Sequence, residues 1–398
     1  MKELRDLRAP GEGDAQRRAW ELTAAAAAER AAASPEDAHA GGARTGRPRS
    51  RRGALALAGA AATAALLAIT PAGAAVSDFV RSVVDDQPPA RASGLEALPG
   101  GGRVLVLAER RDGGPEPWIA GEGVHRRLGG AADAAAWSPH GRFVAIGRES
   151  ELFAVDPKGE RRWSIPAPGP VRDVRWSPDG FRVAYTAGAE LRVVAGDGTG
   201  DRRVAGMRPG EPPGFGSFDW RPGPGHVLAF DKRQSLFLAD LDRRRVLWRV
   251  TVRDEPRVLF SPAGDRLLLA GARDVRVLDP RDGRVLQRVR SPRGWSVVDA
   301  AWDRTGRRLA VVRKTSGRAE VLVGRPHGRT IRLRRRFSAG ELGLVGFSPD
   351  NRWLLVDWTE TQTWLFLPAG GGRARQLTDV PRRFRARGVM PQAWCCAP

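Results

Sequence analysis

The stretch WSPDGFRVAY, residues 176–185, decides the fold of this 398-residue chain because variants of it recur along the sequence. It predicts a strand that ends at Trp176, a reverse turn over Pro178, Asp179 and Gly180, and a second strand with alternating side chains. Proline presets φ at the first corner of a turn, aspartate accepts a hydrogen bond from its own backbone, and glycine tolerates the positive φ that closes the turn. The stretch therefore indicates a repeated β-hairpin and is poor evidence for a functional site.

Six copies of this stretch are visible, and each begins with an aromatic residue. They start at Trp137, Trp176, Trp220, Phe260, Trp302 and Phe347. The intervals between these aromatics are 39, 44, 40, 42 and 45 residues. A nearly constant period of this length, with turn residues at fixed places, is typical of β-propeller blades that have four short strands each.

The two ends of the repeat region are incomplete in complementary ways. Before Trp137, strands are expected over 103–108, 117–120 and 124–128, without an inner strand. The segment 389–396 lies where one more inner strand is due. We therefore predict an all-β, seven-bladed β-propeller that closes by pairing of the C-terminal strand with the first blade, which removes open sheet edges.

The motif followed by an alternating strand and an Asp-Gly turn resembles the TolB-type, WD-repeat-like β-propellers of bacteria. The resemblance covers 98–398, and it is close for the copies at Trp137, Trp176, Phe260 and Phe347. The copies at Trp220 and Trp302 depart from the motif in the turn. Together with the N-terminal region, the chain is similar to membrane-anchored propeller proteins of high-GC bacteria. This resemblance implies a binding scaffold and carries over no catalytic residues.

The N-terminal region predicts a membrane anchor. Residues 53–76 form an uncharged apolar run, and its 24 residues can cross a hydrocarbon core of about 30 Å at about 1.5 Å per residue. Arginines precede this run and aspartates follow it, so the positive-inside rule places 1–52 in the cytoplasm and the propeller outside. The cytoplasmic segment is expected to be mostly disordered with a helix near 16–33, and 77–97 to be a linker.

Export with a cleaved signal remains a second interpretation. Residues 50–55, SRRGAL, resemble a twin-arginine signal, and 72–74 resemble a small-residue cleavage site. Both interpretations place the large domain outside the cytoplasm.

The net charge of the chain bears on whether its partner is a nucleic acid. The chain has 66 Lys+Arg against 45 Asp+Glu, a net charge of +21, but only four of the basic residues are lysine. This bias follows GC-rich codons, so nucleic acid is not the expected partner.

Cys395 and Cys396 are adjacent. Because a vicinal disulfide is strained, the sequence favours two small side chains on a terminal strand.

No catalytic, cofactor or metal site is predicted. There is no Gly-x-Ser-x-Gly elbow, and the five histidines do not have the spacing of metal ligands. In a propeller, loops that enter the inner strands converge at the mouth of the central channel. On this reasoning the candidate binding residues are Arg172, Asp173, Trp295 and Asp299. The alternative is that these side chains bond neighbouring blades.

The leading hypothesis is a monomeric propeller that acts outside the cytoplasm as a scaffold for an unknown protein or envelope ligand. A second hypothesis is an extracytoplasmic propeller enzyme, a lyase or hydrolase with its site at the channel mouth. A third is a transmembrane regulator whose helix at 16–33 docks a cytoplasmic partner such as a sigma factor.

Overall fold

The structure, a computed structural model, describes residues 90–91, 94–111, 113–206, 215–252, 256–325, 331–337 and 341–396. The predicted helix at 16–33 and the predicted span at 53–76 lie outside these residues. Within the described part of the chain, no helix is long and apolar enough to cross a membrane.

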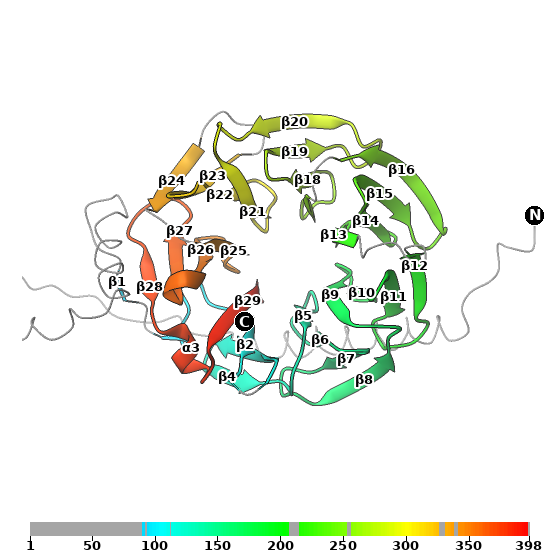
Figure 1. Ribbon diagram of the computed structural model, residues 1–398, viewed down its shortest axis with the longest axis horizontal. Coiled ribbons are helices and arrows are strands. Elements are labelled where there is room, and N and C mark those ends of the chain that lie inside the picture. The colour runs from blue at the N-terminus through cyan, green and yellow to red at the C-terminus, as the bar shows by residue number, and fades with distance from the viewer. Residues whose placement is uncertain are drawn as a thin grey trace, which may run out of the picture. The chain divides into compact units, whose positions relative to one another are not determined.

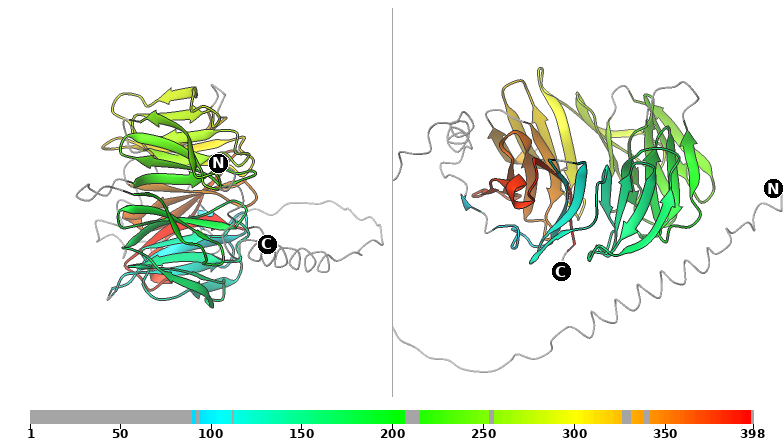
Figure 2. Two further views of the ribbon diagram at one scale, coloured as in Figure 1. Left: turned by 90° about the vertical axis from the view of Figure 1, so that its right-hand side faces the viewer. Right: turned by 60° about the horizontal axis from the view of Figure 1, so that its bottom comes forward.

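Seven antiparallel sheets stand around a central axis, as Figure 1 shows, and Figure 2 shows the same sheets edge-on. From the inner to the outer edge, blade 1 contains β29 (Gly388–Cys395), β2 (Arg103–Glu109), β3 (Pro115–Gly121) and β4 (Val124–Arg127). Blade 2 contains β5 (Ala134–Trp137), β6 (Val144–Arg148), β7 (Glu151–Val155) and β8 (Arg161–Pro166). Blade 3 contains β9 (Val171–Trp176), β10 (Arg182–Ala187), β11 (Glu190–Ala195) and β12 (Arg202–Gly206).

The remaining blades follow the same order. Blade 4 contains β13 (Phe215–Trp220), β14 (Val227–Lys232), β15 (Ser235–Asp240) and β16 (Arg245–Thr251). Blade 5 contains β17 (Arg257–Phe260), β18 (Leu267–Ala270), β19 (Asp274–Leu278) and β20 (Val285–Arg290). Blade 6 contains β21 (Ser296–Trp302), β22 (Leu309–Lys314), β23 (Ala319–Gly324) and β24 (Ile331–Phe337). Blade 7 contains β25 (Leu342–Phe347), β26 (Trp353–Trp358), β27 (Thr363–Pro368) and β28 (Arg375–Leu377), with β1 (Ala90–Arg91) parallel to β28. The seven-bladed architecture is confirmed.

The ring closes where the C-terminal strand β29 pairs antiparallel with β2, so that Val104 lies opposite Trp394 and Leu107 opposite Met390. The indole of Trp394 donates a hydrogen bond to the carbonyl of Gly101 at 2.9 Å. Its ring meets the edge of Phe366, in blade 7, at a centroid distance of 5.7 Å. One aromatic side chain thus joins the last strand to the segment before β2 in its own blade and to blade 7.

The repeated hairpin is held by its serine. In blade 3 the Ser177 hydroxyl accepts from the backbone N–H of Arg182 at 2.9 Å and donates to Asp179 at 2.5 Å. The turn glycine, Gly180, has a φ of 79°, and its N–H donates to the carbonyl of Ser177. In blade 6 the serine is replaced by Asp303, whose carboxylate accepts from the N–H of Arg308 at 3.1 Å. Asp303 in blade 6 therefore accepts the same backbone hydrogen bond as Ser177 in blade 3.

The motif tryptophan connects adjacent blades. The indole of Trp176 donates to the carbonyl of Ala136 in blade 2 at 3.2 Å, and the indole of Trp220 donates to the carbonyl of Arg175 in blade 3 at 3.0 Å. The indole of Trp302 donates to the carbonyl of Leu259 in blade 5 at 3.4 Å. Each of these acceptors lies directly before the motif aromatic of the preceding blade. The same bond therefore recurs at three interfaces of the ring, between blades 2 and 3, 3 and 4, and 5 and 6.

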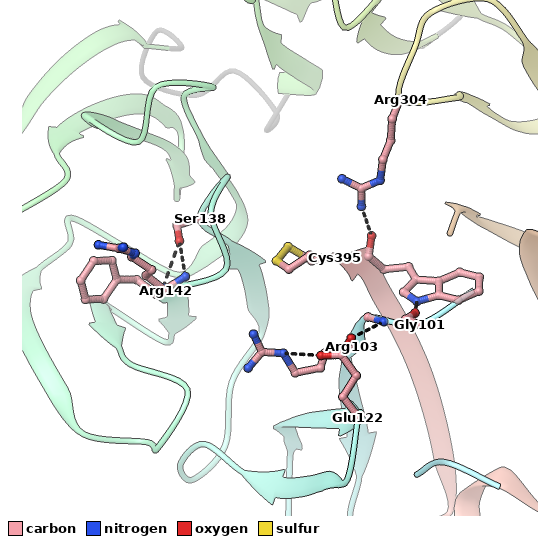
Figure 3. The surroundings of a disulfide bond; sticks show 11 residues. Gly101, Arg103, Glu122, Ser138, Arg142, Arg304 and Cys395 are labelled. Atoms are coloured by element: carbon pink, nitrogen blue, oxygen red, sulfur yellow. Dashed lines mark hydrogen bonds and ion pairs between the residues drawn. A yellow bond between two sulfur atoms is a disulfide. The ribbon is translucent and has the colours of Figure 1, made fainter. Parts of the chain in front are cut away.

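Cys395 and Cys396 form a disulfide in the structure, which corrects the expectation of two separate thiols. Figure 3 shows this disulfide between the turn of blade 2, at Ser138, and the side chain of Arg304. A Cβ added to Gly141 in that turn would lie 2.2 Å from the Cys396 sulfur. The disulfide is therefore packed against the neighbouring blade. The sequence did not reveal this because no other cysteine is present to suggest a pairing.

The hydrophobic core lies in layers between blades. Leu105 and Ile119 of blade 1 are buried against Val144 and Ile146 of blade 2. Similar layers join the other neighbouring blades, as between blades 6 and 7. Because both faces of the central strands are buried, their side chains do not alternate cleanly between apolar and polar. Burial of apolar area between blades therefore supplies most of the stabilisation of the ring.

Replacing Trp394 with alanine is expected to lower the free energy of unfolding by about 3–5 kcal/mol, because the indole fills a buried site between blades 1 and 7. Chemical denaturation followed by tryptophan fluorescence measures this loss. Met390→Ala on the same strand is the matched control, since Met390 is 47% exposed, and it should cost less than about 1 kcal/mol. Equal losses in the two variants would contradict the role of Trp394 in ring closure.

A second prediction concerns His226, which joins blades 3 and 4. Its Nε2 lies 3.2 Å from Asp179 and its Nδ1 lies 2.9 Å from Asp242. Burial alone would lower the pKa of His226, but the two carboxylates outweigh burial and raise this pKa. The added stability is therefore fully present below the unfolded pKa of about 6.5 and is lost as the pH rises through the raised folded pKa.

We expect His226→Gln to cost about 1 kcal/mol at pH 5.5, a value limited by solvent screening of the half-exposed carboxylates, and less at pH 9. His140→Gln is the matched control, because His140 is exposed in the equivalent turn of blade 2. Denaturation midpoints at both pH values give the comparison. A loss that is independent of pH would show that the ion pairs do not contribute.

Candidate functional site

A cavity of about 450 Å³ lies in the central channel. Inner strands of six of the seven blades contribute to its wall, and β26 of blade 7 adds one residue. The lining residues are Arg175, Ser217, Arg257, Asp299, Gly343, Asp357, Met390, Pro391 and Gln392. A cavity of this volume suits a small molecule or the tip of a larger partner, and the convergence of polar groups on it is typical of a binding site.

One side of the cavity holds a network of arginine and aspartate. Arg257 of β17 donates to a carboxylate oxygen of Asp299 on β21, and this oxygen also accepts from the N–H of Ala300 at 2.7 Å. In blade 4, Asp219 accepts from the N–H of Phe260 at 2.7 Å. These bonds run from blade to blade, so the charges on this side also hold the inner strands together.

The electrostatics of this network follow from burial. Burial raises the pKa of Asp219, although Arg175 and Arg257 act in the opposite direction. Burial would lower the pKa of Arg175, but the carboxylates of Asp173, Asp219 and Asp299 raise it, so the guanidinium stays charged. The positive charge of Arg175 is therefore already balanced by protein carboxylates.

Asp357 lies outside this network, on β26 of blade 7. It is 8% exposed, and one carboxylate oxygen accepts from the hydroxyl of Thr359 at 3.0 Å. Burial raises the pKa of Asp357 to about 6, because no full positive charge offsets the loss of water around the carboxylate. Strongly shifted carboxylates of this kind are common at functional sites.

Gly343 lines the cavity beside Asp357. It is paired with Asp357 across β25 and β26, and a Cβ added to Gly343 would lie 4.0 Å from the Cβ of Asp357. A larger side chain at this position would have to occupy the space beside the carboxylate. Glycine in the interior of a strand weakens the strand and often marks a site that a ligand approaches.

The structure places the four candidate residues predicted from the sequence in different environments. Asp299 lines the cavity. Asp173 lies near the network, with a carboxylate oxygen 3.9 Å from Nε of Arg175. Arg172 is mostly exposed and lies 3.7 Å from a carboxylate oxygen of Asp133 in blade 2. Trp295 is covered by the guanidinium of Arg313 at 4.8 Å from its ring centroid.

Sequence reasoning missed the other lining residues because they lie within strands, where their neighbours follow the blade pattern. The available signals were Gly343 inside a predicted inner strand and Asp357 at the end of an apolar run. Among the described residues, no group of three or more His, Cys, Asp or Glu side chains is arranged to hold a metal ion.

No protein-family model and no curated protein sequence matches the chain. Solved structures do resemble it. The β-propeller domain of Cps50 (Swd1) from Myceliophteria thermophila is 14% identical, with a TM-score of 0.50, over 62% of this chain and 86% of that one. A protein from Lactobacillus plantarum is 15% identical, with a TM-score of 0.53, over 73% and 99%. Hydrazine synthase from Kuenenia stuttgartiensis is 16% identical, with a TM-score of 0.47, over 60% and 76%. At these identities the likeness shows the propeller fold alone.

The raised pKa of Asp357 predicts a pH-dependent effect of its amide variant. Between pH 4 and 6 the folded state binds more protons at this site than the unfolded state, so the contribution of Asp357 to stability falls as the pH rises. Asp357→Asn is therefore expected to raise the free energy of unfolding by about 1–3 kcal/mol at pH 7.5 and to give no gain at pH 4. Calorimetry at both pH values tests this.

The matched control is Glu360→Gln, which removes one carboxylate three residues away at an exposed position. It should change stability by less than about 0.5 kcal/mol at either pH. Destabilisation by Asp357→Asn at pH 7.5 would mean that the ionised carboxylate is balanced in the folded protein.

Proposed function

We propose that the chain is a membrane-anchored, extracytoplasmic propeller that acts as a binding scaffold, with its central cavity as the ligand-binding site. The observation that carries this proposal is the convergence of polar and charged side chains from six blades on one cavity of about 450 Å³. A rigid ring holds these groups in fixed positions, so little ordering entropy is lost when a ligand binds. The ligand is a small molecule or an exposed segment of a protein partner.

Two observations support a location outside the cytoplasm. The apolar run at 53–76 with arginines on its N-terminal side is the pattern of a single-pass anchor whose C-terminal domain is exported. Independently, Cys395 and Cys396 form a disulfide, and disulfides persist mainly in oxidising compartments. A soluble form that lacks the first 74 residues would favour the twin-arginine alternative.

A propeller enzyme is the second candidate function, and Asp357 is the observation that favours it. A carboxyl group whose burial raises its pKa to about 6 can exchange a proton near neutral pH, as a general acid or base in a lyase or hydrolase must. The two functions differ in one measurement. An enzyme would keep ligand binding but lose turnover in Asp357→Asn, whereas a scaffold has no turnover to lose.

Blocking the channel tests the proposed site. Gly343→Leu places a larger side chain beside Asp357, and we expect it to reduce ligand binding at least tenfold while thermal unfolding changes by only a few degrees. The assay is saturation-transfer NMR on the full chain in detergent micelles, with a fixed library of amines, carboxylates, sugars and phosphate esters.

Gly317→Leu is the matched control, because an added Cβ at Gly317 has no neighbour within 4 Å and the residue lies in an exposed turn of blade 6. Library members that bind the parent protein and the Gly317→Leu variant, but not Gly343→Leu, support the central cavity as the site. A library without any member that binds contradicts a small-molecule ligand, and binding that survives Gly343→Leu contradicts the central cavity as the site.

A further inference from the structure

The two sides of the cavity differ in how their charges are balanced. Arg257 is paired with Asp299, and Arg175 lies among three carboxylates. Asp357 is more than nine-tenths buried and lines the cavity, and no lysine or arginine among the described residues forms an ion pair with it. The donors beside it, the hydroxyl of Thr359 and the indole of Trp364, are neutral. A buried carboxylate without a cation is costly unless something else supplies the positive charge.

The wall that β29 forms beside Asp357 contains two apolar side chains next to the polar Gln392. Strand β29 packs beside β25 and β26, and its residues Met390 and Pro391 line the same cavity. Met390 is one of the most exposed large apolar side chains of the ring, at 47%. Methionine adapts well to irregular apolar ligands, and an exposed apolar side chain inside a cavity is a contact that a ligand can cover.

We propose that the central cavity binds an organic ammonium ion with a short apolar body, its charged nitrogen on Asp357 and its body against Met390 and Pro391. This inference rests on the proposed function and names the chemical class of the ligand. The ammonium would donate to the carboxylate in a site shielded from water, where charge-assisted hydrogen bonds are strong. The apolar body would cover the exposed methionine.

The geometry disfavours the other classes of ligand. A carboxylate or phosphate ligand would need a free cation, but the guanidinium groups of Arg175 and Arg257 already face Asp173, Asp219 and Asp299. The Arg175 side chain is 30% exposed and the Arg257 side chain 37%, so an anionic ligand could reach them only in competition with these carboxylates. A metal ion prefers several oxygen or nitrogen ligands, whereas one aspartate suits an ammonium.

Isothermal titration of the full chain with three four-carbon probes tests the inference: n-butylamine, n-butanol and butyrate. At pH 7.5 we expect n-butylamine to bind at least tenfold more tightly than either of the other two. Asp357→Asn should reduce n-butylamine affinity at least tenfold, and Glu360→Gln should leave it unchanged. Met390→Ser should weaken n-butylamine binding several-fold, because it removes the apolar contact.

Protonation gives an additional readout. The charged groups that line the cavity are Arg175, Arg257, Asp299 and Asp357. Since the pKa of Asp357 is raised to about 6, lowering the pH from 7.5 to 5 should weaken n-butylamine binding about tenfold through protonation of this carboxylate. Thermal unfolding at pH 5 shows whether the fold persists.

The possible failures are distinguishable. Butanol or butyrate binding as tightly as n-butylamine, with all binding lost in Gly343→Leu, would overturn the ammonium inference and leave the cavity as the site. Binding of n-butylamine that is unchanged in Asp357→Asn would also overturn it. If none of the three probes binds and other library ligands bind equally to Gly343→Leu, both the inference and the proposed function fail.

Discussion

Apolar packing between neighbouring blades is the interaction on which the ring depends, and the motif aromatics are part of it. At three interfaces the motif tryptophan also donates a hydrogen bond to the carbonyl of the preceding blade, from Trp176 to Ala136, from Trp220 to Arg175 and from Trp302 to Leu259. Because donor and acceptor occupy the same positions at these three interfaces, the bond repeats the same offset between the inner strands there. The motif residue is phenylalanine in blades 5 and 7, so the apolar layers alone join those blades to the preceding ones at this position. The recurring aromatic therefore packs between blades, and at three interfaces it also donates a hydrogen bond.

Blade 1 lacks the turn that follows the inner strand in the other blades, so another group has to fill its place where the ring closes. In other blades the turn glycine packs near the proline of the preceding turn, as Gly306 does with Pro262, where an added Cβ would lie 3.4 Å from the ring. Blade 1 has no such turn, because its inner strand comes from the C-terminus. In blade 1 the disulfide-bonded Cys395 and Cys396 directly follow Trp394, at the position where Ser-Pro follows the motif tryptophan. This disulfide lies against Gly141. A short, rigid group thus occupies the equivalent place.

The fold could be predicted from the sequence because the physical requirements of a hairpin are local. The predicted hairpin around residues 176–185 agrees with β9 and β10, since Pro178 and Gly180 determine where the chain reverses. The disulfide could not be predicted, because its fit depends on a turn far away in the sequence. The cavity was predicted only in its general position, in the central channel. Its lining residues come from strands, and their convergence is a property of the closed ring.

At Asp357, the residue that a binding site requires differs from the residue that would make the fold most stable. For stability alone, blade 7 would favour a side chain at 343 that covers the carboxylate, or an uncharged residue at 357, since burial without a cation costs free energy. The chain has glycine at 343 and aspartate at 357, so β25 lacks side-chain packing and the core lacks an apolar contact at the same place. Natural proteins accept such local losses where a binding site requires them. The ring can carry this loss because the apolar layers on both sides of blade 7 hold its strands in place without any contribution from Asp357.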